Sequence, residues 1–418
     1  MKDSYKSYID NPWVAFIPFL FLYALVVIFF GEKELVGDEP RYLAFATNIL
    51  KGYYSPKPPH INLWNGPGYP MLLAPFMVLK DHVFLIRLLN AFLLYFSLVL
   101  TFKTIGRLSN KRTAYVTCSI LGLYYPIYEF LPTVLTECFT WFLISAICFI
   151  AFRLLGAQRS SRKLFISFSI TLAILILTKV IFAYVISLLL VMSVFFISLP
   201  KTRYMARKAA LGLALSLLFC TPYLFYTYQL TGKVFYWADS GGMSLYTMSS
   251  PAPDEYGDWR DGDQLLEDPD HTEFMIVING LDPVPRDSAY KAQAVANIKQ
   301  YPKKYLMNCA ANVGRMWFSY PYTDTEQSLT TFFTILPNMF VVVLIGLSLL
   351  VATWRLKALP HTLIFLLCFV SIYLFGSTMV SAYRRMFFIT LPFWVIFCAY
   401  VWTVLVAFEW KNPNHKSS

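Results

Sequence analysis

The sequence predicts an all-α protein that crosses a membrane many times. Hydrophobic residues make up 57% of its 418 residues and charged residues only 14%, and the mean hydropathy is +0.53. The apolar residues gather in long runs, and a helix needs roughly 20 such residues to cross the hydrocarbon core of a bilayer. Soluble globular domains carry about 25% charged residues. The composition therefore excludes a soluble globular protein.

The apolar runs predict about ten membrane spans. The first run extends from Trp13 to Phe30, with no strongly basic segment before it and no small-residue cleavage site after it. We therefore expect a retained span rather than a signal peptide. The other runs cover residues 83–105, 113–128, 132–154, 164–178, 180–199, 209–228, 332–353, 359–377 and 386–408.

Lys and Arg are concentrated in the loops that are cytoplasmic if the N-terminus is inside, such as residues 103–112 and 201–208. The positive-inside rule then predicts that both chain termini are cytoplasmic and that residues 31–82 and 231–331 form loops on the outer face. This asymmetry accounts for the formal net charge of +11. No nucleic-acid partner is needed to explain it.

Three parts follow from this topology. Residues 1–230 form a module of spans that contains the first outer loop (31–82), residues 231–331 form a large outer loop, and residues 332–418 supply the last spans. Internal repeats and inverted halves are not apparent, which weighs against a transporter. A loop of this length inside a bundle is usually functional.

The first outer loop shows two helical patterns. Apolar residues recur at helical spacing over residues 39–51, which predicts an amphipathic helix lying on the membrane and ending near Gly52. Residues 66–79 predict a second interfacial helix. In the large outer loop, the acidic, proline- and glycine-rich residues 249–270 predict a surface loop. A helical pattern follows from Ser288 to Phe318, interrupted at Pro302.

Cysteine and histidine patterns do not predict a metal site. The seven cysteines form no CxxC pair, and only Cys309 falls in the large outer loop. The five histidines are scattered, without HExxH spacing. We therefore expect no disulfide framework, no metal and no cofactor.

The stretch GDEPRY places Asp38, Glu39 and Arg41 where the chain leaves the first span, and Lys57 follows in SPKPPH. Asp38 as a helix N-cap and Glu39 in the first helical turn would be a purely structural explanation. Capping does not account for the two cations. An enzyme that acts on a charged, lipid-linked substrate would account for all four residues.

Other charged residues are expected at the same face. Glu137 opens a span, where a carboxylate is favoured by the helix dipole or serves a site. Lys179 marks an outer hairpin and either extends to the interface or binds substrate. Arg384 and Arg385 run against the positive-inside bias, which a bound phosphate would explain.

Several motifs together resemble GT-C glycosyltransferases. DEPRY, the amphipathic helix after it, the KPP turn at Lys57 and GPGYPMLLAP are similar to the first outer loop of the branch that includes lipid A aminoarabinose transferases and bacterial protein O-mannosyltransferase-like enzymes. LTE (135–137), LTK (177–179), residues 221–246, NIKQYPKKYL (297–306) and YRRMFFITLPF (383–393) fit that branch in order. One departure is Tyr226–Thr227, where the family usually has arginine and asparagine.

The resemblance implies an inverting transfer from a polyprenyl-phosphate-linked sugar, such as an undecaprenyl phosphate sugar, at the outer face of a bacterial inner membrane. A positioned carboxylate can deprotonate the acceptor hydroxyl, and cations can stabilise the leaving phosphate. We expect Asp38 to be the base, with Glu39 or Glu137 orienting substrate. The residues expected to bind the lipid phosphate or sugar are Arg41, Tyr42, Lys57, His60, Lys179, Arg384 and Arg385.

The acceptor stays open at this point, because a glycan, a lipid or a protein would each supply a hydroxyl. Two other classes of protein also stay open. A polyprenyl-linked oligosaccharide polymerase or ligase would use a similar donor and a large outer loop. A lipid-linked sugar flippase or transporter would place its charges within the spans instead of at their outer ends.

Overall fold

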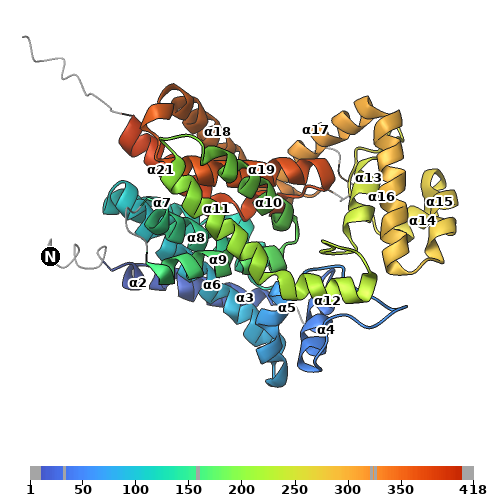
Figure 1. Cartoon of the computed structure of the whole chain (residues 1–418). Helices are drawn as coiled ribbons and strands as arrows, with labels where there is room; N and C mark the ends of the chain where they lie inside the picture. The colour runs from blue at the N-terminus through green and yellow to red at the C-terminus, as the bar shows by residue number, and fades with distance from the viewer. Residues whose placement is uncertain (1–10, 32–33, 157–160, 321–322, 324–326, 407–418) are drawn as a thin grey trace, which may run out of the picture.

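The computed structural model describes residues 11–31, 34–156, 161–320, 323 and 327–406, which form helices and connecting segments without a strand (Figure 1). Both chain termini, predicted to be cytoplasmic, lie outside the described residues. The predicted all-α membrane architecture is confirmed.

Five apolar segments of the described chain are long enough to cross a membrane, and a pair of helices bent by 43° supplies a sixth if it is one span. The five are α2–α3 (Pro12–Ala15, Ile17–Phe30), α6 (His82–Leu108), α8 (Glu137–Leu154), α18 (Phe332–Trp354) and α19 (His361–Val380); the bent pair is α11 (Arg203–Phe219) and α12 (Thr221–Thr231). Shorter helices complete the bundle: α7 (Lys111–Gly122), α9 (Arg162–Thr178), α10 (Ile181–Phe196) and α21 (Leu391–Tyr400) with η5 (Val401–Leu405). The count of about ten spans stays a prediction.

The surface of the bundle is apolar, as a bilayer requires. Phe21 and Phe30 on α3 and Phe340 on α18 are each about two-thirds exposed. In water such a surface would be costly, whereas hydrocarbon solvates it. The most hydrophobic part of α8 is 72% buried, against 17% for the first span. Helix α8 therefore lies inside the bundle, and the first span lies at its edge.

The first loop (residues 31–82) contains both predicted interfacial helices. Helix α4 (Glu39–Leu50) is followed closely by Gly52, whose φ of 86° is a left-handed conformation that favours glycine. The backbone N–H of Tyr53 then donates to the carbonyl of Asn48 at 3.2 Å. The second helix is α5 (Gly68–Leu73), continued by the 3₁₀ turn η1 (Ala74–Val78).

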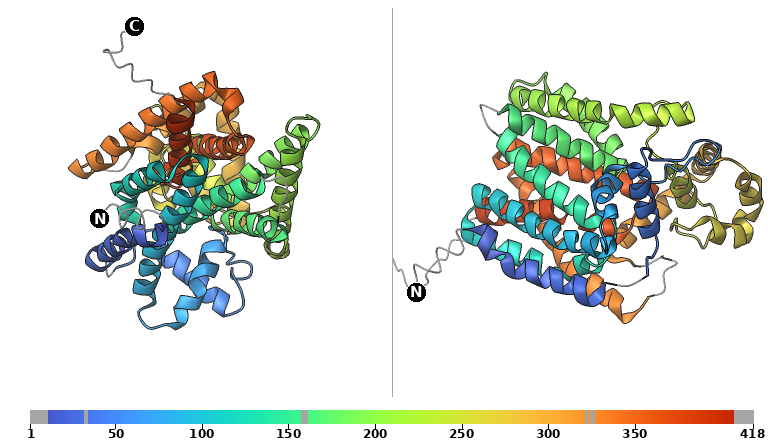
Figure 2. Two further views of the ribbon diagram at one scale, coloured as in Figure 1. Left: turned by 90° about the vertical axis from the view of Figure 1, so that its left-hand side faces the viewer. Right: turned by 90° about the horizontal axis from the view of Figure 1, so that it is seen from below.

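The large loop (residues 231–331) packs as a helical unit at one end of the bundle, on the right in Figure 1 and again in the right-hand view of Figure 2. Its helices are α13 (Gly241–Met248), α14 (Gly262–Glu267), α15 (Pro269–Asn279), α16 (Pro283–Gln300) and α17 (Pro302–Phe318). It has a small core of its own, formed by Met243, Tyr246, Leu265, Met275, Ile278, Tyr290 and Ala294. The remaining short elements are η2 (Tyr125–Phe130), η3 (Leu329–Thr331), η4 (Leu356–Ala358) and α20 (Arg384–Phe388).

The prediction that residues 249–270 form a surface loop is wrong for their second half. Asp261 caps α14 in a capping box with Gln264, and the Asp268 side chain accepts from the backbone of Asp270 at the start of α15. Pro269 has the φ that suits a first helical position. The acidic residues and proline of this stretch are therefore helix starts as well as turn formers.

One face of α17 ties the large loop to the bundle. Asn308 and Asn312 are four residues apart and therefore lie on the same side of the helix. Asn308 donates to the Met248 carbonyl at 3.0 Å, and Asn312 donates to the Thr378 carbonyl near the end of α19 at 3.0 Å. Both amides are buried. The hydrogen bond of Asn312 to the Thr378 carbonyl thus holds the large loop against α19, and it is buried away from water.

Asp287 on α16 is the polar centre of the large loop, and it is 2% exposed. Its Oδ1 accepts from the backbone N–H of Gly242 at 2.7 Å, and its Oδ2 accepts from Tyr236 at 2.9 Å and from Lys291 at 2.7 Å. A buried carboxylate is tolerated only with partners of this kind. Asp287 therefore fixes the start of α13 against α16.

We expect Asp287→Ala to destabilise the large loop by about 2–4 kcal/mol, because it leaves buried donors without an acceptor. Thermal unfolding and limited proteolysis of the protein in detergent would measure the loss. Asp282→Ala is the matched control, since Asp282 is exposed and makes no capping hydrogen bond. Equal melting temperatures for the two variants would contradict this role of Asp287.

Candidate active site

Asp38 lies at the start of α4, at the end of the bundle that carries the large loop. Its side chain makes no capping hydrogen bond, so the capping explanation is wrong for this residue. Its Oδ1 accepts from Arg41 at 3.0 Å, and its Oδ2 lies 3.6 Å from Nη1 of Arg385. All three side chains are a quarter to a third exposed. The carboxylate therefore faces two guanidinium groups at a site that solvent reaches.

Glu39, the next residue, points into the protein and is 1% exposed. One carboxylate oxygen accepts from the backbone of Val36 at 3.0 Å and lies 3.6 Å from Arg87, and the other accepts from the backbone of Val134 at 2.5 Å. Both oxygens are used by protein groups. Glu39 thus joins the first loop to α6 and to the segment before α8.

Asn90 holds the same segment from the other side. Its buried amide donates to the carbonyls of Leu131 at 3.1 Å and Thr133 at 2.8 Å. Residues 131–134 lead directly into α8, whose first residue is Glu137. Asn90 and Glu39 together therefore fix the position at which α8 starts, and with it the position of Glu137.

Glu137 and Lys179 form a buried ion pair. The Lys179 ammonium donates to Oε1 of Glu137 at 3.1 Å, and the two side chains are 13% and 1% exposed. Within the described part of the chain, Oε2 of Glu137 and the hydroxyl of Tyr69 are buried without a hydrogen-bond partner. A substrate hydroxyl could supply the missing donor to Oε2, since such atoms are costly to leave unpaired.

Two glycines of the first loop make the Lys179 position possible. A Cβ on Gly66 would lie 2.1 Å from the Leu177 carbonyl oxygen, and one on Gly68 would lie 2.6 Å from the Thr178 backbone nitrogen. Only glycine lets the first loop lie this close to the end of α9. The contact places the residue after Thr178, which is Lys179, beside Glu137.

Tyr42 lies between these charged groups. Its hydroxyl accepts from Asn65 at 3.1 Å, and its ring meets Tyr69 edge to face at 5.2 Å. Burial raises the pKa of Tyr42 strongly, and the charges of Asp38 and Glu137 raise it further. Tyr42 therefore stays a neutral phenol and adds a hydroxyl to the cluster.

Arg384 points away from the cluster, although the sequence predicts it to be a phosphate ligand. Its guanidinium pairs with Glu129 at 2.6 and 3.2 Å and donates to Thr334 at 3.0 Å. Such a paired guanidinium joins η2, α18 and α20. Arg385, its neighbour, is the member of the pair that reaches Asp38.

Lys57 and His60 lie on the exposed connection between α4 and α5. Neither side chain forms an ion pair within the described ranges. Tyr226 of α12 anchors this connection, because its hydroxyl accepts from the backbone of Ser55 at 2.9 Å and donates to the Ser55 carbonyl at 3.1 Å. Tyr226, the residue at which the sequence departs from the pattern noted above, thus holds the loop that carries Lys57.

Asp239 joins the first loop to the large loop. Its Oδ2 accepts from the backbone of Leu63 at 2.9 Å, and its own N–H donates to the Leu63 carbonyl at 3.2 Å. Oδ1 is buried without a partner among the described residues. Burial raises the pKa of Asp239 to about 6, and the nearby charge of Asp287 contributes to the rise.

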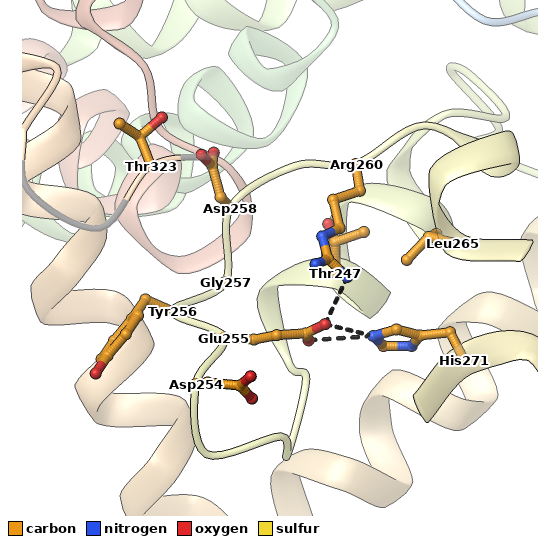
Figure 3. A pocket seen from close by; sticks show the side chains of 10 residues that line it. All are labelled: Thr247, Asp254, Glu255, Tyr256, Gly257, Asp258, Arg260, Leu265, His271 and Thr323. Atoms are coloured by element: carbon orange, nitrogen blue, oxygen red, sulfur yellow. Dashed lines mark hydrogen bonds and ion pairs between the residues drawn. The ribbon is translucent and has the colours of Figure 1, made fainter. Parts of the chain in front are cut away.

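A cavity of about 330 Å³ lies within the large loop and is lined mainly by polar side chains (Figure 3). Asp254, Glu255 and Asp258 contribute carboxylates from the segment before α14. Arg260 and His271 approach from the other side, and Glu255 contacts both. Acidic groups outnumber basic groups in the lining.

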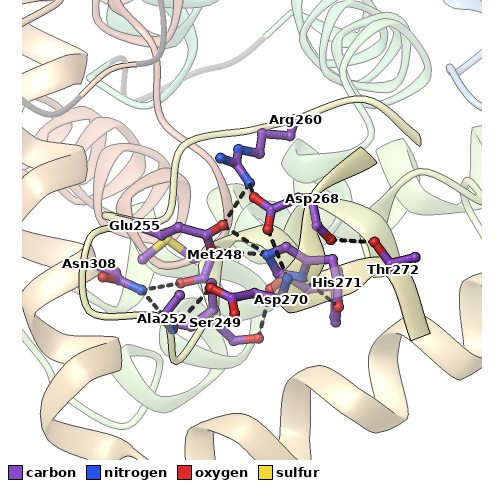
Figure 4. A network of polar contacts seen from close by, with 12 residues as sticks. Met248, Ser249, Ala252, Glu255, Arg260, Asp268, Asp270, His271, Thr272 and Asn308 are labelled. Atoms are coloured by element: carbon purple, nitrogen blue, oxygen red, sulfur yellow. Dashed lines mark hydrogen bonds and ion pairs between the residues drawn. The ribbon is translucent and has the colours of Figure 1, made fainter. Parts of the chain in front are cut away.

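The hydrogen bonds beside this cavity form one network (Figure 4). Arg260 pairs with Glu255 at 2.6 Å and with Asp268 at 2.5 Å, while His271 contacts Glu255 at 2.9 Å and Tyr246 at 2.7 Å. Burial raises the pKa of Glu255, but hydrogen bonds from His271 and Ser250 and the charge of Arg260 outweigh it, so the pKa lies below its usual value.

Glu255, Asp268 and His271 could also hold a metal ion, since their ligand atoms lie within 4.8 Å of one another. The guanidinium of Arg260 already lies on both carboxylates. It supplies the positive charge that a cation would otherwise bring. These residues therefore serve as a polar core for the loop around the cavity.

The phenol of Tyr383 is affected by charges from both the cavity and the Asp38 cluster. Burial raises its pKa, with Asp258 of the cavity raising it further and Arg385 lowering it. The Arg385 guanidinium lies 5.5 Å from the centre of the Tyr383 ring. Tyr383 therefore links the two groups of charges electrostatically.

The structure thus gathers some of the predicted residues and separates others. One cluster contains Asp38, Arg41, Tyr42, Glu137, Lys179 and Arg385. Glu39 and Arg384 hold the surrounding backbone and helices, and Lys57 and His60 stand on an exposed loop. Sequence reasoning missed the role of Tyr226, Asp239 and the cavity, although Asp239 falls within residues 221–246, which resemble the family pattern.

No family model and no curated protein sequence matches the chain. Solved structures do match. The oligosaccharyltransferase of Archaeoglobus fulgidus, tethered to an acceptor peptide containing the NVT sequon, aligns with 93% of this chain and 49% of its own, at 12% identity and a TM-score of 0.54. ArnT from Cupriavidus metallidurans bound to undecaprenyl phosphate aligns with 93% of this chain and 77% of its own, at 14% identity and a TM-score of 0.41.

The match to the archaeal enzyme shows a common fold. The chain spans about half the length of that oligosaccharyltransferase.

The raised pKa of Asp239 predicts a pH dependence of stability. Because the pKa rises from 3.8 to about 6 on folding, the contribution of Asp239 is fully present below about pH 4 and is lost as the pH rises through 6. Asp239→Asn keeps an acceptor for the Leu63 N–H but does not titrate. The wild type should therefore lose about 2–3 kcal/mol relative to this variant between pH 4 and 7.

Chemical or thermal unfolding of both proteins across this pH range would measure the difference. Asp282→Asn, at an exposed site, is the control and should follow the wild type. A constant difference between wild type and Asp239→Asn from pH 4 to 7 would refute the assignment.

Proposed function

We propose that the chain, which shares the fold of the archaeal oligosaccharyltransferase, is a GT-C glycosyltransferase that transfers a sugar from a polyprenyl-phosphate donor to an acceptor hydroxyl. The observation that carries the proposal is the meeting of Asp38, Glu137, Lys179 and Arg385 at one end of the bundle. These residues come from segments up to about 350 positions apart, and burying the charges of Glu137 and Lys179 is costly. The same end faces outward if the termini are cytoplasmic in a bacterial inner membrane.

In the proposed reaction the acceptor oxygen attacks the anomeric carbon of the donor sugar. Asp38 takes the hydroxyl proton as general base. The bond between the anomeric carbon and the phosphate oxygen breaks, and its electron pair stays on the polyprenyl phosphate. A single displacement of this kind inverts the anomeric carbon. Oε2 of Glu137 accepts a hydrogen bond from a hydroxyl of the sugar or the acceptor and so orients that group.

Arg385 links donor binding to the base. In the free protein it lies 3.6 Å from Asp38. The donor phosphate is a diester with one negative charge, but its negative charge grows as the sugar departs, so a guanidinium beside it is held more strongly as the reaction proceeds. Binding of the donor would then draw Arg385 from Asp38 and free that carboxylate for the acceptor proton. Lys179 and Arg41 supply further positive charge.

The structure changes the proposed roles of several predicted residues. Glu39 and Arg384 become positioning residues, because protein groups occupy both side chains. Lys57 and His60 would reach the donor from their exposed loop, held at its base by Tyr226. Tyr42 contributes a neutral hydroxyl between Asp38 and Glu137.

The cavity of the large loop is the proposed acceptor side. Its lining carries several carboxylates next to Arg260, and the charge of Asp258 in that lining acts on Tyr383, whose ring centre lies 5.5 Å from the Arg385 guanidinium. Its volume of about 330 Å³ is at the low end of ligand pockets, roughly 300–1,000 Å³. A neutral, hydroxyl-bearing acceptor group fits such a lining, whereas a phosphorylated group would be repelled.

We expect Asp38→Asn to lower sugar transfer by about 10²–10⁴-fold, because the variant cannot accept the proton. The folded amount should change little, since the Asp38 contacts are partly exposed and salt-screened. Transfer from a purified polyprenyl-phosphate sugar, normalised to folded protein, is the measurement. Glu39→Gln should instead lower the amount of folded protein more than the turnover of what remains. Normal turnover in Asp38→Asn would remove Asp38 from the mechanism.

We expect Lys57→Ala and Arg385→Ala to weaken use of the donor more than use of the acceptor. Losing a cation partner of a bound phosphate costs about 2–5 kcal/mol. The donor concentration at half-maximal rate and the turnover number would report it. Lys51→Ala is the control, because Lys51 is an exposed cation at the end of α4. If all three variants used the donor alike, the phosphate site would lie elsewhere.

A further inference from the structure

A second cavity, of about 420 Å³, lies at the opposite end of the bundle. Its lining residues are Pro12, Phe102, Lys103, Gly106, Arg107, Lys111, Phe149 and Arg153. Glu137 and Arg153 belong to the same helix, α8, with a separation of 16 residues. At 1.5 Å per residue they lie roughly 24 Å apart along the helix axis. The cavity is therefore at the other membrane boundary from the Asp38 cluster.

Positive charge converges on this cavity. The guanidinium carbons of Arg107 and Arg153 both lie over the ring of Phe149, at 5.6 and 5.3 Å from its centre. The Lys103 ammonium lies 4.5 Å from the centre of the Trp13 ring. Lys103, Arg107 and Arg153 form no ion pair with a carboxylate in the described part of the chain. Acidic residues are also lacking among the described residues of the lining.

Topology alone does not explain this arrangement. The positive-inside rule concerns the number of Lys and Arg in a cytoplasmic loop and not their direction. Here cationic side chains from α6, α7 and α8 line one cavity that also has apolar side chains in its lining. Two of them, Arg107 and Arg153, lie over the same ring, that of Phe149. Like charges held this close repel one another unless an anion lies between them.

We propose that this cavity binds the head group of an anionic phospholipid of the inner leaflet. The phosphate would lie among Lys103, Arg107 and Arg153, where two guanidinium groups can each donate paired hydrogen bonds. Basic pockets between spans at the cytoplasmic face suit such head groups. The site is separate from the proposed transfer reaction and does not depend on it.

The apolar part of the lining favours a lipid over free phosphate. Pro12 and Phe102 are buried side chains at the wall, and Phe149 is half-buried between the two arginines. These side chains would lie against the glycerol and first acyl carbons of a lipid. A free phosphate ion would leave that apolar wall unused.

The test is lipid binding by the purified full chain. Native mass spectrometry and thermal unfolding would be measured in detergent with dioleoyl phosphatidylglycerol, with dioleoyl phosphatidylcholine and with inorganic phosphate. The test variant is Lys103→Gln/Arg107→Gln/Arg153→Gln. The matched control is Arg162→Gln/Lys163→Gln/Lys201→Gln, which removes three exposed cations from the same end of the bundle.

We expect the wild type and the control to retain phosphatidylglycerol in preference to phosphatidylcholine and to melt at a higher temperature with it. The test variant should bind it roughly 10–100-fold more weakly, from the charge lost at the membrane surface. Equal binding of the two lipids by the wild type would overturn the proposal. So would an equal loss in the control, or stabilisation by inorganic phosphate as large as that by phosphatidylglycerol.

Discussion

The buried ion pair between Glu137 and Lys179 is the interaction on which the rest of the site depends. Taking two charges out of water costs several kcal/mol each, and only close pairing offsets that cost. Breaking such a pair by removing one partner typically costs about 3–5 kcal/mol. Glu39 and Asn90 fix the start of α8, and the contact of Gly66 and Gly68 with the end of α9 fixes Lys179. The surrounding structure thus holds two charges that would separate in water.

The cluster around this pair is electrically balanced only in part. Asp38 and Glu137 are close to Lys179, Arg41 and Arg385, so the described cluster carries one more cation than anion. A bound phosphate would complete the balance at the membrane boundary. In the large loop the sign is opposite, because Arg260 offsets only one of the two negative charges of Glu255 and Asp268. The two polar regions therefore suit different ligands, although charges of both act on Tyr383.

The sequence was sufficient to predict the features that depend on local pattern. Helical spacing and Gly52 predict α4. The positions of Asp38, Glu137, Lys179 and Arg385 at the outer ends of apolar runs predict that they share one face. Periodicity cannot show which partner a side chain selects. Arg384 and Arg385 are adjacent, yet one pairs with Glu129 and the other approaches Asp38. Asp38 and Glu39 are also adjacent, yet Asp38 approaches Arg385 whereas Glu39 accepts from the backbone of Val134. Tyr226 and Asp239 bind the backbone of a loop that lies more than 150 residues earlier in the sequence.

The central claim is that a polyprenyl phosphate binds beside Asp38 and Arg385. The most direct test is photolabelling of the purified protein with an undecaprenyl phosphate analogue that carries a photoreactive group next to the phosphate, followed by peptide mapping. The account predicts labelling in residues 34–57, 176–184 and 381–388, abolished by an excess of unlabelled undecaprenyl phosphate. Labelling confined to α13–α15 or to the opposite end of the bundle, or labelling that the unlabelled lipid does not reduce, would contradict it.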